Sequence, residues 1–295
     1  MKFLKGLALA ILSFLLFLSL SVFGLVLTLN QTILNPDFVV SQVDRLDIPS
    51  LAGEMISQQM PQEQEFIAGV ASDTIADLEP WIKEQVTTGI YSFYDYLEGR
   101  SENLSLIISL EPAKEKFKDN LWQAASQSPP PELAGLPPAE IERELNEFYS
   151  EFSEQIPSTF ELDEASLDPQ VMAQLEQAKQ IVGYLHLAYN ALIGLILLLI
   201  LGIVLINRQV KGTTRQLGSA FLSAGAASYI GVFVAKQFAG TQLTQLDMPV
   251  YLQMLAPQFV TDTLAPLEMY GIGLLVAGVA LLVVSFVHKQ HQPSL

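Results

Sequence analysis

The chain contains no cysteine among its 295 residues. This absence excludes a disulfide framework, a thiol nucleophile and a metal site built on thiolates. Histidine is also scarce, with three residues, and the sequence has no HExxH, GxSxG or Walker pattern. We therefore expect a protein that is not an enzyme and that carries no cofactor.

Charged residues are few and unevenly placed. They make up 16% of the chain, against about 25% in an average soluble domain. Residues 30–181 hold 28 Asp and Glu but only eight Lys and Arg, whereas the remaining residues hold three acidic and seven basic side chains. Such an acidic block repels phosphate, which excludes nucleic acid as a partner. The uneven charge indicates an acidic domain bounded by membrane segments.

Three long uncharged runs predict membrane spans. Residues 6–29 lack charge over 24 residues, whereas a cleaved signal peptide has an apolar core of about 7–15 residues before a small-residue cleavage site. We interpret this run as an uncleaved signal anchor, with a cleaved signal as the alternative. Residues 191–206 and 270–287 form the other two runs.

Basic residues set the orientation and require a fourth span. Arg208, Lys211 and Arg215 follow the second run and Lys289 follows the last, and cations beside a span indicate the cytoplasmic side. The chain must therefore cross the membrane once between these two points. Residues 217–240 are the candidate, since 24 helical residues extend about 36 Å. Both termini then lie in the cytoplasm and the acidic domain lies outside.

The predicted fold is mainly α: a four-span transmembrane helical bundle with a large, mostly helical extracytoplasmic domain inserted between spans 1 and 2. The expected segments are the signal-anchor helix 1–29, the acidic domain 30–181 with a Pro-rich connector at 126–138, the second span 182–207, a basic cytoplasmic loop 208–216, the third span 217–240, a short external segment 241–265, the fourth span 266–287 and a cytoplasmic tail 288–295.

Several local features are expected in the acidic domain. Asn35 is a plausible N-cap before Pro36, and two helices should be separated at Pro80, the second one closed by Gly99. Residues 104–110 and 157–162 look extended and are expected to pair. A further helix should run without interruption from about residue 169 into the second span.

The third span carries a row of small residues at i, i+4 spacing. Because packing holds helices together in a bilayer, such a row predicts close contact with the fourth span or with a second copy of the chain. The alternative is a chance run of small residues. The residues of this predicted packing face are Ser219, Ser223, Ala227, Gly231 and Ala235 on the third span and Gly273 and Ala277 on the fourth.

Polar residues mark the outer end of the second span. His186, Tyr189 and Asn190 share one helix face. They are expected to be interfacial belt residues with one interhelical hydrogen bond, and binding of a lipid headgroup or a proton is the alternative.

Lys236 lies one turn from the outer end of the third span. Its ammonium group can extend to the headgroups. Pairing with Asp262 or Glu268, or a role on an ion path, is the other interpretation.

Four carboxylates gather near the membrane in the stretch ELDEASLD, and oxygen ligands of this kind suit Ca²⁺ or Mg²⁺. The spacing does not match an EF-hand loop, so a solvated acidic turn is expected and no metal site is predicted. The four candidate ligands are Glu161, Asp163, Glu164 and Asp168.

These patterns favour an integral membrane protein of a prokaryotic cell envelope, in the plasma membrane. Its acidic external domain would bind, sense or help assemble a partner without catalysis. Besides the lipid bilayer, the expected partner is another membrane or envelope protein, or a second copy of the chain. The alternatives are an oligomeric transport or channel subunit and a metal-dependent envelope hydrolase.

Overall fold

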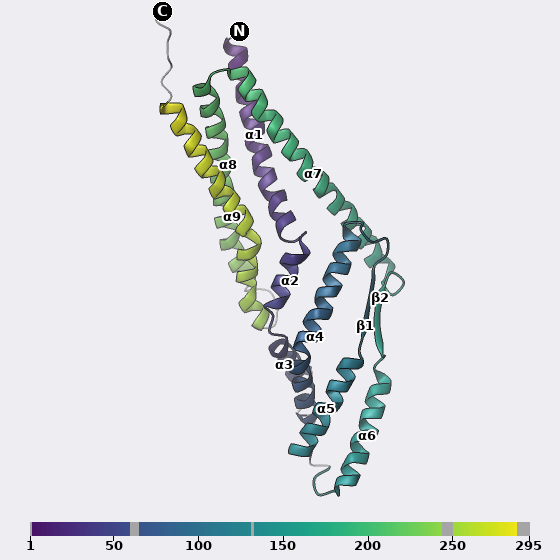
Figure 1. The fold of residues 1–295 in the computed structure, drawn as a ribbon. Coiled ribbons are helices and arrows are strands. Elements are labelled where there is room, and N and C mark those ends of the chain that lie inside the picture. The colour runs from purple at the N-terminus through teal and green to yellow at the C-terminus, as the bar shows by residue number, and fades with distance from the viewer. Residues whose placement is uncertain (1, 60–64, 131–132, 244–249, 288–295) are drawn as a thin grey trace, which may run out of the picture. The chain divides into compact units, whose positions relative to one another are not determined.

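The computed structural model describes residues 2–59, 65–130, 133–243 and 250–287. These residues form nine helices and one two-stranded sheet (Figure 1). The chain divides into two compact units: a terminal unit of Met1–Phe38 and Gln180–Leu295, and a central unit of Val39–Lys179.

Four helices are long and apolar enough to cross a membrane: α1 (Lys2–Gln31), α7 (Pro169–Asn207), α8 (Val210–Leu243) and α9 (Val250–Val287). Helices of this length and hydropathy are typical of multi-pass membrane proteins. The prediction of a mainly helical chain with four helices long and apolar enough to cross a membrane is confirmed. The predicted third span, residues 217–240, lies in α8, which has the lowest mean hydropathy of the four.

The terminal unit has a shared apolar core. Leu16 of α1, Ile203 of α7 and Ala224 of α8 have no exposed surface. Two hydrogen bonds tie α1 to its neighbours: Ser13 Oγ donates to Gln216 Oε1 at 2.6 Å and Tyr270 Oη donates to the Leu20 carbonyl at 2.9 Å. The four apolar helices therefore contact one another through side chains drawn from both ends of the sequence.

The turn between α7 and α8 is tighter than predicted. Helix α8 begins at Val210, so most of the expected loop 208–216 is helical, and Arg208 makes the turn with a φ of 53°. Lys5 Nζ donates to the Asn207 carbonyl at 3.4 Å, and Ser285 Oγ donates to the Lys211 carbonyl at 3.1 Å. The prediction placed the boundary by hydropathy, but the backbone hydrogen bonds of a helix continue beyond its apolar stretch.

The fourth apolar helix also begins earlier than predicted. Helix α9 starts at Val250 and contains both Pro257 and Pro266, so residues 250–265 are helix rather than a separate external connection. Proline removes one backbone donor, and neighbouring groups can compensate for it in helices of this kind. Residues 244–249 and the predicted tail 288–295, with its two histidines, lie outside the described residues.

Side-chain caps start the first helices after α1. Asn35 Oδ1 accepts from the Asp37 amide at 3.0 Å at the start of α2 (Pro36–Asp44), as predicted. Asp47 caps α3 (Ile48–Gln59): its carboxylate accepts from the Ser50 amide at 3.0 Å and from Ser50 Oγ at 2.6 Å. These two hydrogen bonds stabilise the charged carboxylate and lower the pKa of Asp47 below its usual value.

Helix α4 (Glu65–Leu97) ends near Gly99 as predicted but lacks the predicted break at Pro80. It runs through Pro80 without a break, so the predicted separation into two helices is wrong. An interior proline costs about 3 kcal/mol, and packing on both sides of Pro80, at Leu78 and at Tyr94, offsets that cost. Gly99 closes the helix as predicted, with a φ of 74° that favours glycine.

The two extended segments pair as expected. Strands β1 (Ser105–Ser109) and β2 (Thr159–Asp163) are antiparallel, with Ser105 opposite Asp163 and Ser109 opposite Thr159. Helices α5 (Glu111–Gln127) and α6 (Pro138–Gln155) lie between the strands in the chain (Figure 1). The ribbon thus joins the two ends of a helical hairpin.

Helices α4, α5 and α6 share the core of the central unit. Its buried members are Val70, Phe117, Leu121, Ala125 and Leu145. The rings of Phe117 and Phe152 stack with centroids 4.2 Å apart. A second cluster packs the end of α4 and Leu104 against the first turns of α7.

Candidate functional site

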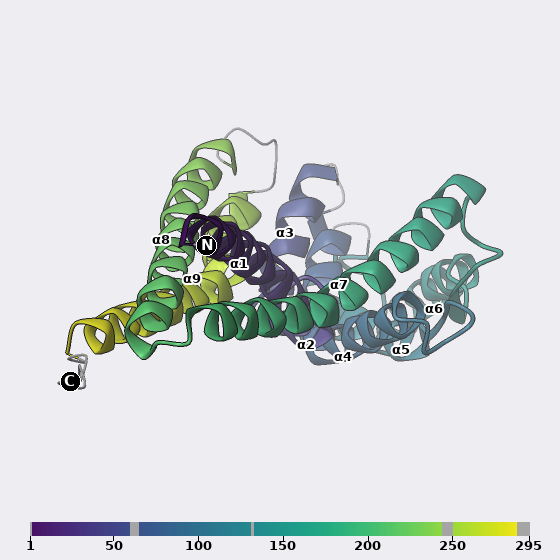
Figure 2. The same ribbon diagram turned by 90° about the horizontal axis from the view of Figure 1, so that it is seen from above.

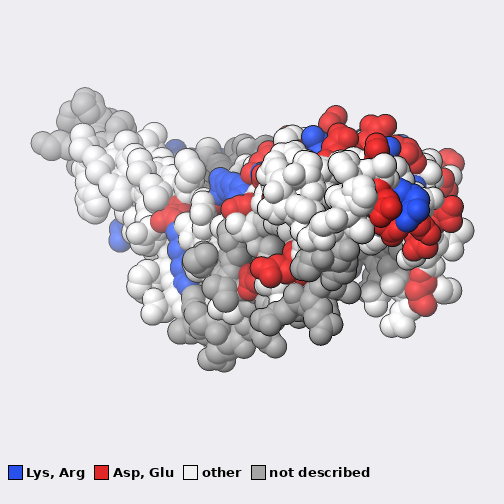
Figure 3. Space-filling view, turned by 90° about the horizontal axis from the view of Figure 1, so that it is seen from below, with Lys and Arg blue, Asp and Glu red and all other residues white. Residues whose placement is uncertain are grey.

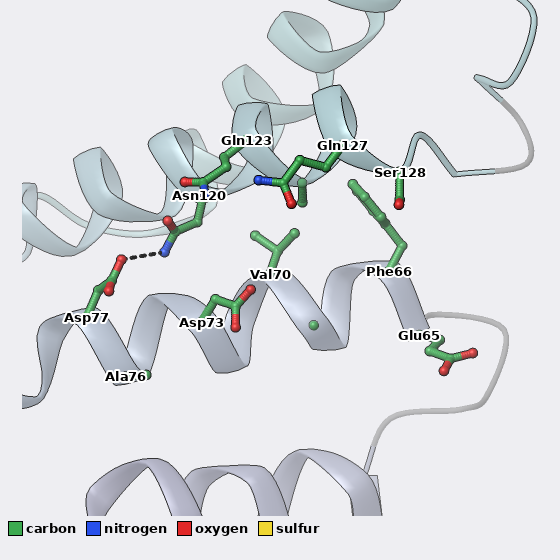
Figure 4. Close-up of a pocket in the computed structure, with 12 residues that line it drawn as sticks. Glu65, Phe66, Val70, Asp73, Ala76, Asp77, Asn120, Gln123, Gln127 and Ser128 are labelled. Carbon is green, nitrogen blue, oxygen red and sulfur yellow. Dashed lines mark hydrogen bonds between the residues drawn. The ribbon is translucent and has the colours of Figure 1, made fainter.

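A cavity of about 510 Å³ opens between α4 and α5 in the central unit (Figure 4). It lies beside the core, on the side where polar residues of the two helices face each other. We call it the α4–α5 cleft. Its lining residues are Glu65, Phe66, Gly69, Val70, Asp73, Ala76 and Asp77 from α4 and Asn120, Gln123, Ala124, Gln127 and Ser128 from α5 and the residue after it.

One wall of the cleft is a row of carboxylates. Glu65, Gly69, Asp73 and Asp77 recur every fourth residue of α4, and residues at this spacing lie one above another on a helix face. Gly69 leaves open space in the row, since an added Cβ would have no neighbour within 4 Å.

The opposite wall presents amides. Asn120, Gln123 and Gln127 of α5 line it, and Gln127 points toward α4 in Figure 4. Asn120 is 9% exposed, and its Nδ2 donates to Thr74 Oγ1 at 3.3 Å and to Asp77 Oδ2 at 3.2 Å. This buried amide fixes the separation of the two helices at one end of the cleft.

The carboxylates of the row are not equivalent. Asp77 accepts from Asn120 and also lies 3.7 Å from Lys116 Nζ, so its charge is partly balanced. Among the residues that the structure describes, Asp73 and Glu65 have no ion-pair partner. Because the Glu65 side chain points away from α5 (Figure 4), the unbalanced negative charge of the cleft lies at Asp73.

The floor between the two walls is apolar. Val70 is 1% exposed, and Phe66 and Ala124 pack against the same core cluster. Phe66 extends from α4 toward Ser128 (Figure 4). An apolar floor between a carboxylate wall and an amide wall suits a ligand that has both cationic and aliphatic parts.

Acidic side chains are also prominent on the molecular surface (Figure 3). Asp and Glu side chains gather in groups on the face shown in Figure 3, with Lys and Arg set among them, in keeping with the excess of acidic residues in this part of the sequence. Such a surface attracts cations and repels anions.

The four candidate metal ligands have local structural roles instead of converging. Asp163 Oδ1 accepts from the Ser166 amide at 2.8 Å, Asp168 Oδ1 from the Gln170 amide at 2.7 Å, and Glu164 Oε1 from the Leu104 amide at 3.4 Å. Glu161 lies in β2 opposite Ile107. Within the described ranges, no group of three or more His, Asp or Glu side chains could hold a metal ion.

The structure gives separate contacts for two of the three residues predicted at the outer end of the second span. The Tyr189 ring stacks on Phe23 of α1 with centroids 5.4 Å apart. Asn190 Nδ2 donates to the His186 carbonyl at 3.1 Å within α7, so the one hydrogen bond here is within a helix and not between helices.

Lys236 pairs with a carboxylate of the neighbouring helix. Its Nζ lies 2.5 Å from Glu268 Oε2, and each side chain is about one-third exposed, at 31% and 33%. Of the two interpretations drawn from the sequence, the structure therefore agrees with pairing to a carboxylate, and the partner is Glu268 rather than Asp262.

Close helix packing occurs beside the predicted row of small residues. Gly218 and Gly225 of α8 contact Gly278 and Gly271 of α9, and Ala220, Ala224 and Ser228 are buried. The predicted residues Ser219, Ser223, Ala227 and Gly231 are exposed in the single chain, and Ala235 is half-buried. On α9, Gly273 has open space around it and Ala277 is half-buried. Contact of this row with a second copy stays a prediction.

The sequence analysis did not identify the α4–α5 cleft. Its signal was the i, i+4 recurrence of Glu65, Gly69, Asp73 and Asp77, which is also the pattern of an ordinary solvated helix face. The amides of α5 belong to no motif and become meaningful only once the two helices are placed side by side.

A scan of the chain against protein-family models found no match, and searches of the curated proteins and of the solved structures found none either.

Proposed function

We propose that this protein is an integral membrane protein whose central unit lies outside the cytoplasm and binds a cationic ligand in the α4–α5 cleft without catalysis. The observation that supports this proposal most directly is the unbalanced carboxylate of Asp73 in a cavity that also has an apolar floor and amide side chains of α5 in its lining. The cavity volume falls within the range of about 300–1,000 Å³ that is typical of small-ligand sites.

The distribution of cations supports this orientation. Lys5, Arg208, Lys211 and Arg215 lie at the ends of α1 and α8 that meet at the α7–α8 turn. Because basic residues beside membrane spans favour the cytoplasmic side, this end of the terminal unit lies in the cytoplasm. The central unit, which follows the other end of α1 in the chain, is then extracytoplasmic, and the plasma membrane is the proposed location.

A binding or assembly role accounts for the polar groups better than a catalytic one. The cleft offers no hydroxyl paired with a base, since Ser128 lies among amides and no histidine lines the cavity. Its carboxylates and amides can recognise a cation through charge-assisted hydrogen bonds. A change caused by ligand binding would then be transmitted to a membrane partner or to a second copy of the chain.

Site-directed photocrosslinking in native membranes tests the ligand-binding role. A photoreactive side chain at Gln123, on the amide wall, should capture a ligand or a partner that the same side chain at the outward-facing Asp119 does not. The Asp73→Asn substitution should abolish this capture. Equal capture at both positions, or capture that does not respond to Asp73→Asn, would rule out the cleft as a cation-binding site.

Thiol labelling tests the proposed orientation. Because the chain lacks cysteine, a single introduced cysteine gives a clean signal. Ser128→Cys should react with a membrane-impermeant reagent in intact cells, and Thr213→Cys should react only after the cells are opened. The reverse pattern would place the central unit in the cytoplasm.

A further inference from the structure

We propose that the outer edge of β2 pairs with an extended, basic segment of a partner protein, which adds a third strand to the β1–β2 ribbon. This inference does not depend on the α4–α5 cleft. Three observations carry it: the backbone groups of β2 that point away from β1, the negative charge of this edge, and an exposed aromatic side chain beside it.

The register of the ribbon determines which backbone groups of β2 point outward. The Leu110 amide donates to the Ser158 carbonyl at 2.8 Å, and continuation of the β1–β2 register places these two residues directly opposite each other. Hydrogen-bonded and non-hydrogen-bonded pairs alternate along an antiparallel ladder. The backbone N–H and C=O groups of Thr159, Glu161 and Asp163 therefore point away from β1.

The other edge of the ribbon, formed by β1, faces α4. Ser92 Oγ of α4 donates to the Ser105 carbonyl of β1 at 3.0 Å, and a Cβ added at Gly89 would lie 3.1 Å from Leu106 Cδ2. Strand β1 accordingly lies between α4 and β2 (Figure 1). Helix α4 thus covers part of the β1 edge, and the edge open to a partner is that of β2.

The open part of the β2 edge is short. At its end, the Asp163 amide donates to Ser166 Oγ at 3.0 Å and the Asp163 carbonyl accepts from that hydroxyl at 2.8 Å. At its start, Pro157 has no backbone donor. Among the residues that the structure describes, none hydrogen-bonds to the outward N–H and C=O groups of Thr159 and Glu161. Such an edge is a template for pairing with a strand of another chain.

The charge of this edge favours a basic partner. Glu161 and Asp163 of β2 are exposed, and residues 144–178 hold nine Asp and Glu but no Lys or Arg. A second copy of the chain would present the same acidic strand, and like charges across a strand pair are destabilising. Lys or Arg in a partner strand would instead form charge-assisted hydrogen bonds with these carboxylates.

The two faces of the ribbon predict an alternating pattern in the partner. Phe160 is 47% exposed and shares a face of the ribbon with Leu106, whereas Glu161 lies on the other face. Directly opposite residues of paired strands contact each other on one face. The partner residue opposite Phe160 should therefore be apolar, and the residue opposite Glu161 should be Lys or Arg.

Fluorescence anisotropy of a labelled peptide, with the full chain in a neutral detergent, tests this inference. The probe is the peptide GKVKVKG, and the comparison is GKKKVVG, which has the same composition and charge without the alternation. We expect the alternating peptide to bind about tenfold more tightly. Methylation of its Lys backbone amides should abolish binding, because these amides face β2, and methylation of its Val backbone amides should not.

Substitutions in the protein separate strand pairing from general attraction to an acidic surface. Thr159→Pro removes an outward donor but no hydrogen bond to β1, a position where an edge strand tolerates proline, and should weaken binding about tenfold. Glu161→Gln should also weaken binding, whereas Glu154→Gln removes the same charge from an exposed position of α6 and should leave it unchanged. Tryptophan emission confirms that each variant is folded.

Several outcomes would overturn the inference. These are equal affinity for the two peptides, binding that survives methylation of the Lys amides, and equal losses in Glu161→Gln and Glu154→Gln. A dimer of the peptide-free chain that Thr159→Pro dissociates would also overturn it, because the edge would then pair with a second copy.

Discussion

Two of the packed helix pairs of this protein, α8–α9 in the terminal unit and α4–α5 in the central unit, meet in different ways. In the terminal unit, α8 and α9 lie side by side (Figure 1 and Figure 2) and approach so closely that an added Cβ at Gly225 would lie 2.7 Å from the Gly271 carbonyl oxygen. In the central unit, α4 and α5 are held apart by large side chains such as Val70 and Leu121. The first contact is between backbones and the second is between side chains.

The difference shows how packing decides where a ligand can bind. Glycine contacts leave no space between α8 and α9, as expected where packing rather than the hydrophobic effect joins helices. Side-chain contacts between α4 and α5 form a core on one side and leave the cleft on the other. Two packed helices thus leave no cavity between them where glycines meet in α8 and α9, and leave a cavity where large side chains meet in α4 and α5.

The largest expected effect is on the side-chain contact of the central unit. Leu121 has no exposed surface, and Leu121→Ala should lower the free energy of unfolding of this unit by about 2–5 kcal/mol. Both tryptophans, Trp81 and Trp122, lie in the central unit, so the midpoint of the tryptophan fluorescence transition measures the effect. Val86→Ala, at a position 39% exposed, should change it little.

The second effect is on the glycine contact of the terminal unit. A Cβ at Gly225 or Gly278 would lie 2.7 Å from backbone atoms of the facing helix, so Gly225→Ala and Gly278→Ala should each cost about 1–3 kcal/mol by overpacking. A reporter cysteine at the buried Ala220 measures this as earlier thiol exposure on heating. Gly273→Ala, at a position with open space, should not advance exposure of the reporter.

A substitution at Gly231 tests which partner packs on the exposed row of small residues, the fourth span or a second copy of the chain. In the single chain a Cβ added at Gly231 would meet no atom of another helix within 4 Å, so Gly231→Leu should leave the α8–α9 contact intact. If a second copy packs on this row, the same substitution should dissociate the oligomer in crosslinking and size-exclusion measurements. An oligomer that survives Gly231→Leu would contradict packing through this row.

A smaller effect is expected at the Lys236–Glu268 pair. Lys236→Met leaves the Glu268 carboxylate without its partner and should destabilise the terminal unit by about 1 kcal/mol, within the range for polar contacts between membrane helices. The reporter cysteine at Ala220 again provides the measurement. Exchanging the two residues should restore stability, and failure of the exchange would show that the contact depends on side-chain shape and not on charge.

The smallest effect concerns the cap of α3. The pKa of Asp47 is lowered in the folded chain by its hydrogen bonds to Ser50, so the folded state favours the charged form. Its contribution is present above the unfolded pKa of about 3.9 and is lost as pH falls through the folded pKa. Asp47→Asn should therefore flatten the acid side of the stability profile slightly, measured by circular dichroism between about pH 5 and 2. An unchanged profile would mean that the cap adds nothing to stability.

Much of this architecture could be predicted because its signals are local. The uncharged runs predicted three of the four apolar helices, and the placement of the basic residues required the fourth. Asn35 and Gly99 marked helix ends, and the extended composition of two short segments predicted the β1–β2 pairing. In each case a few neighbouring residues determine the outcome through hydrogen bonding or hydropathy.

The features that escaped prediction depend on tertiary contacts. Pro80 usually ends a helix, but packing of α4 on both sides of it decides otherwise. On α8, small residues occur on more than one face, because successive residues of a helix are rotated by about 100° about its axis. Only the position of the facing helix determines that Gly218 and Gly225 make the contact. The cleft escaped for the same reason, since its two walls come from helices more than 40 residues apart.

The β1–β2 ribbon has a consequence for the order of folding. About 50 residues separate the strands, and closing a flexible loop of that length costs about 3.5 kcal/mol in its length-dependent entropy alone. Five residue pairs offset little of that cost before the intervening helices form. Helices α5 and α6 should therefore assemble first and bring the strand ends together, so that the ribbon forms late. In the folded protein the same ribbon should open first, and its amides should exchange with solvent faster than those of the α4–α5 core.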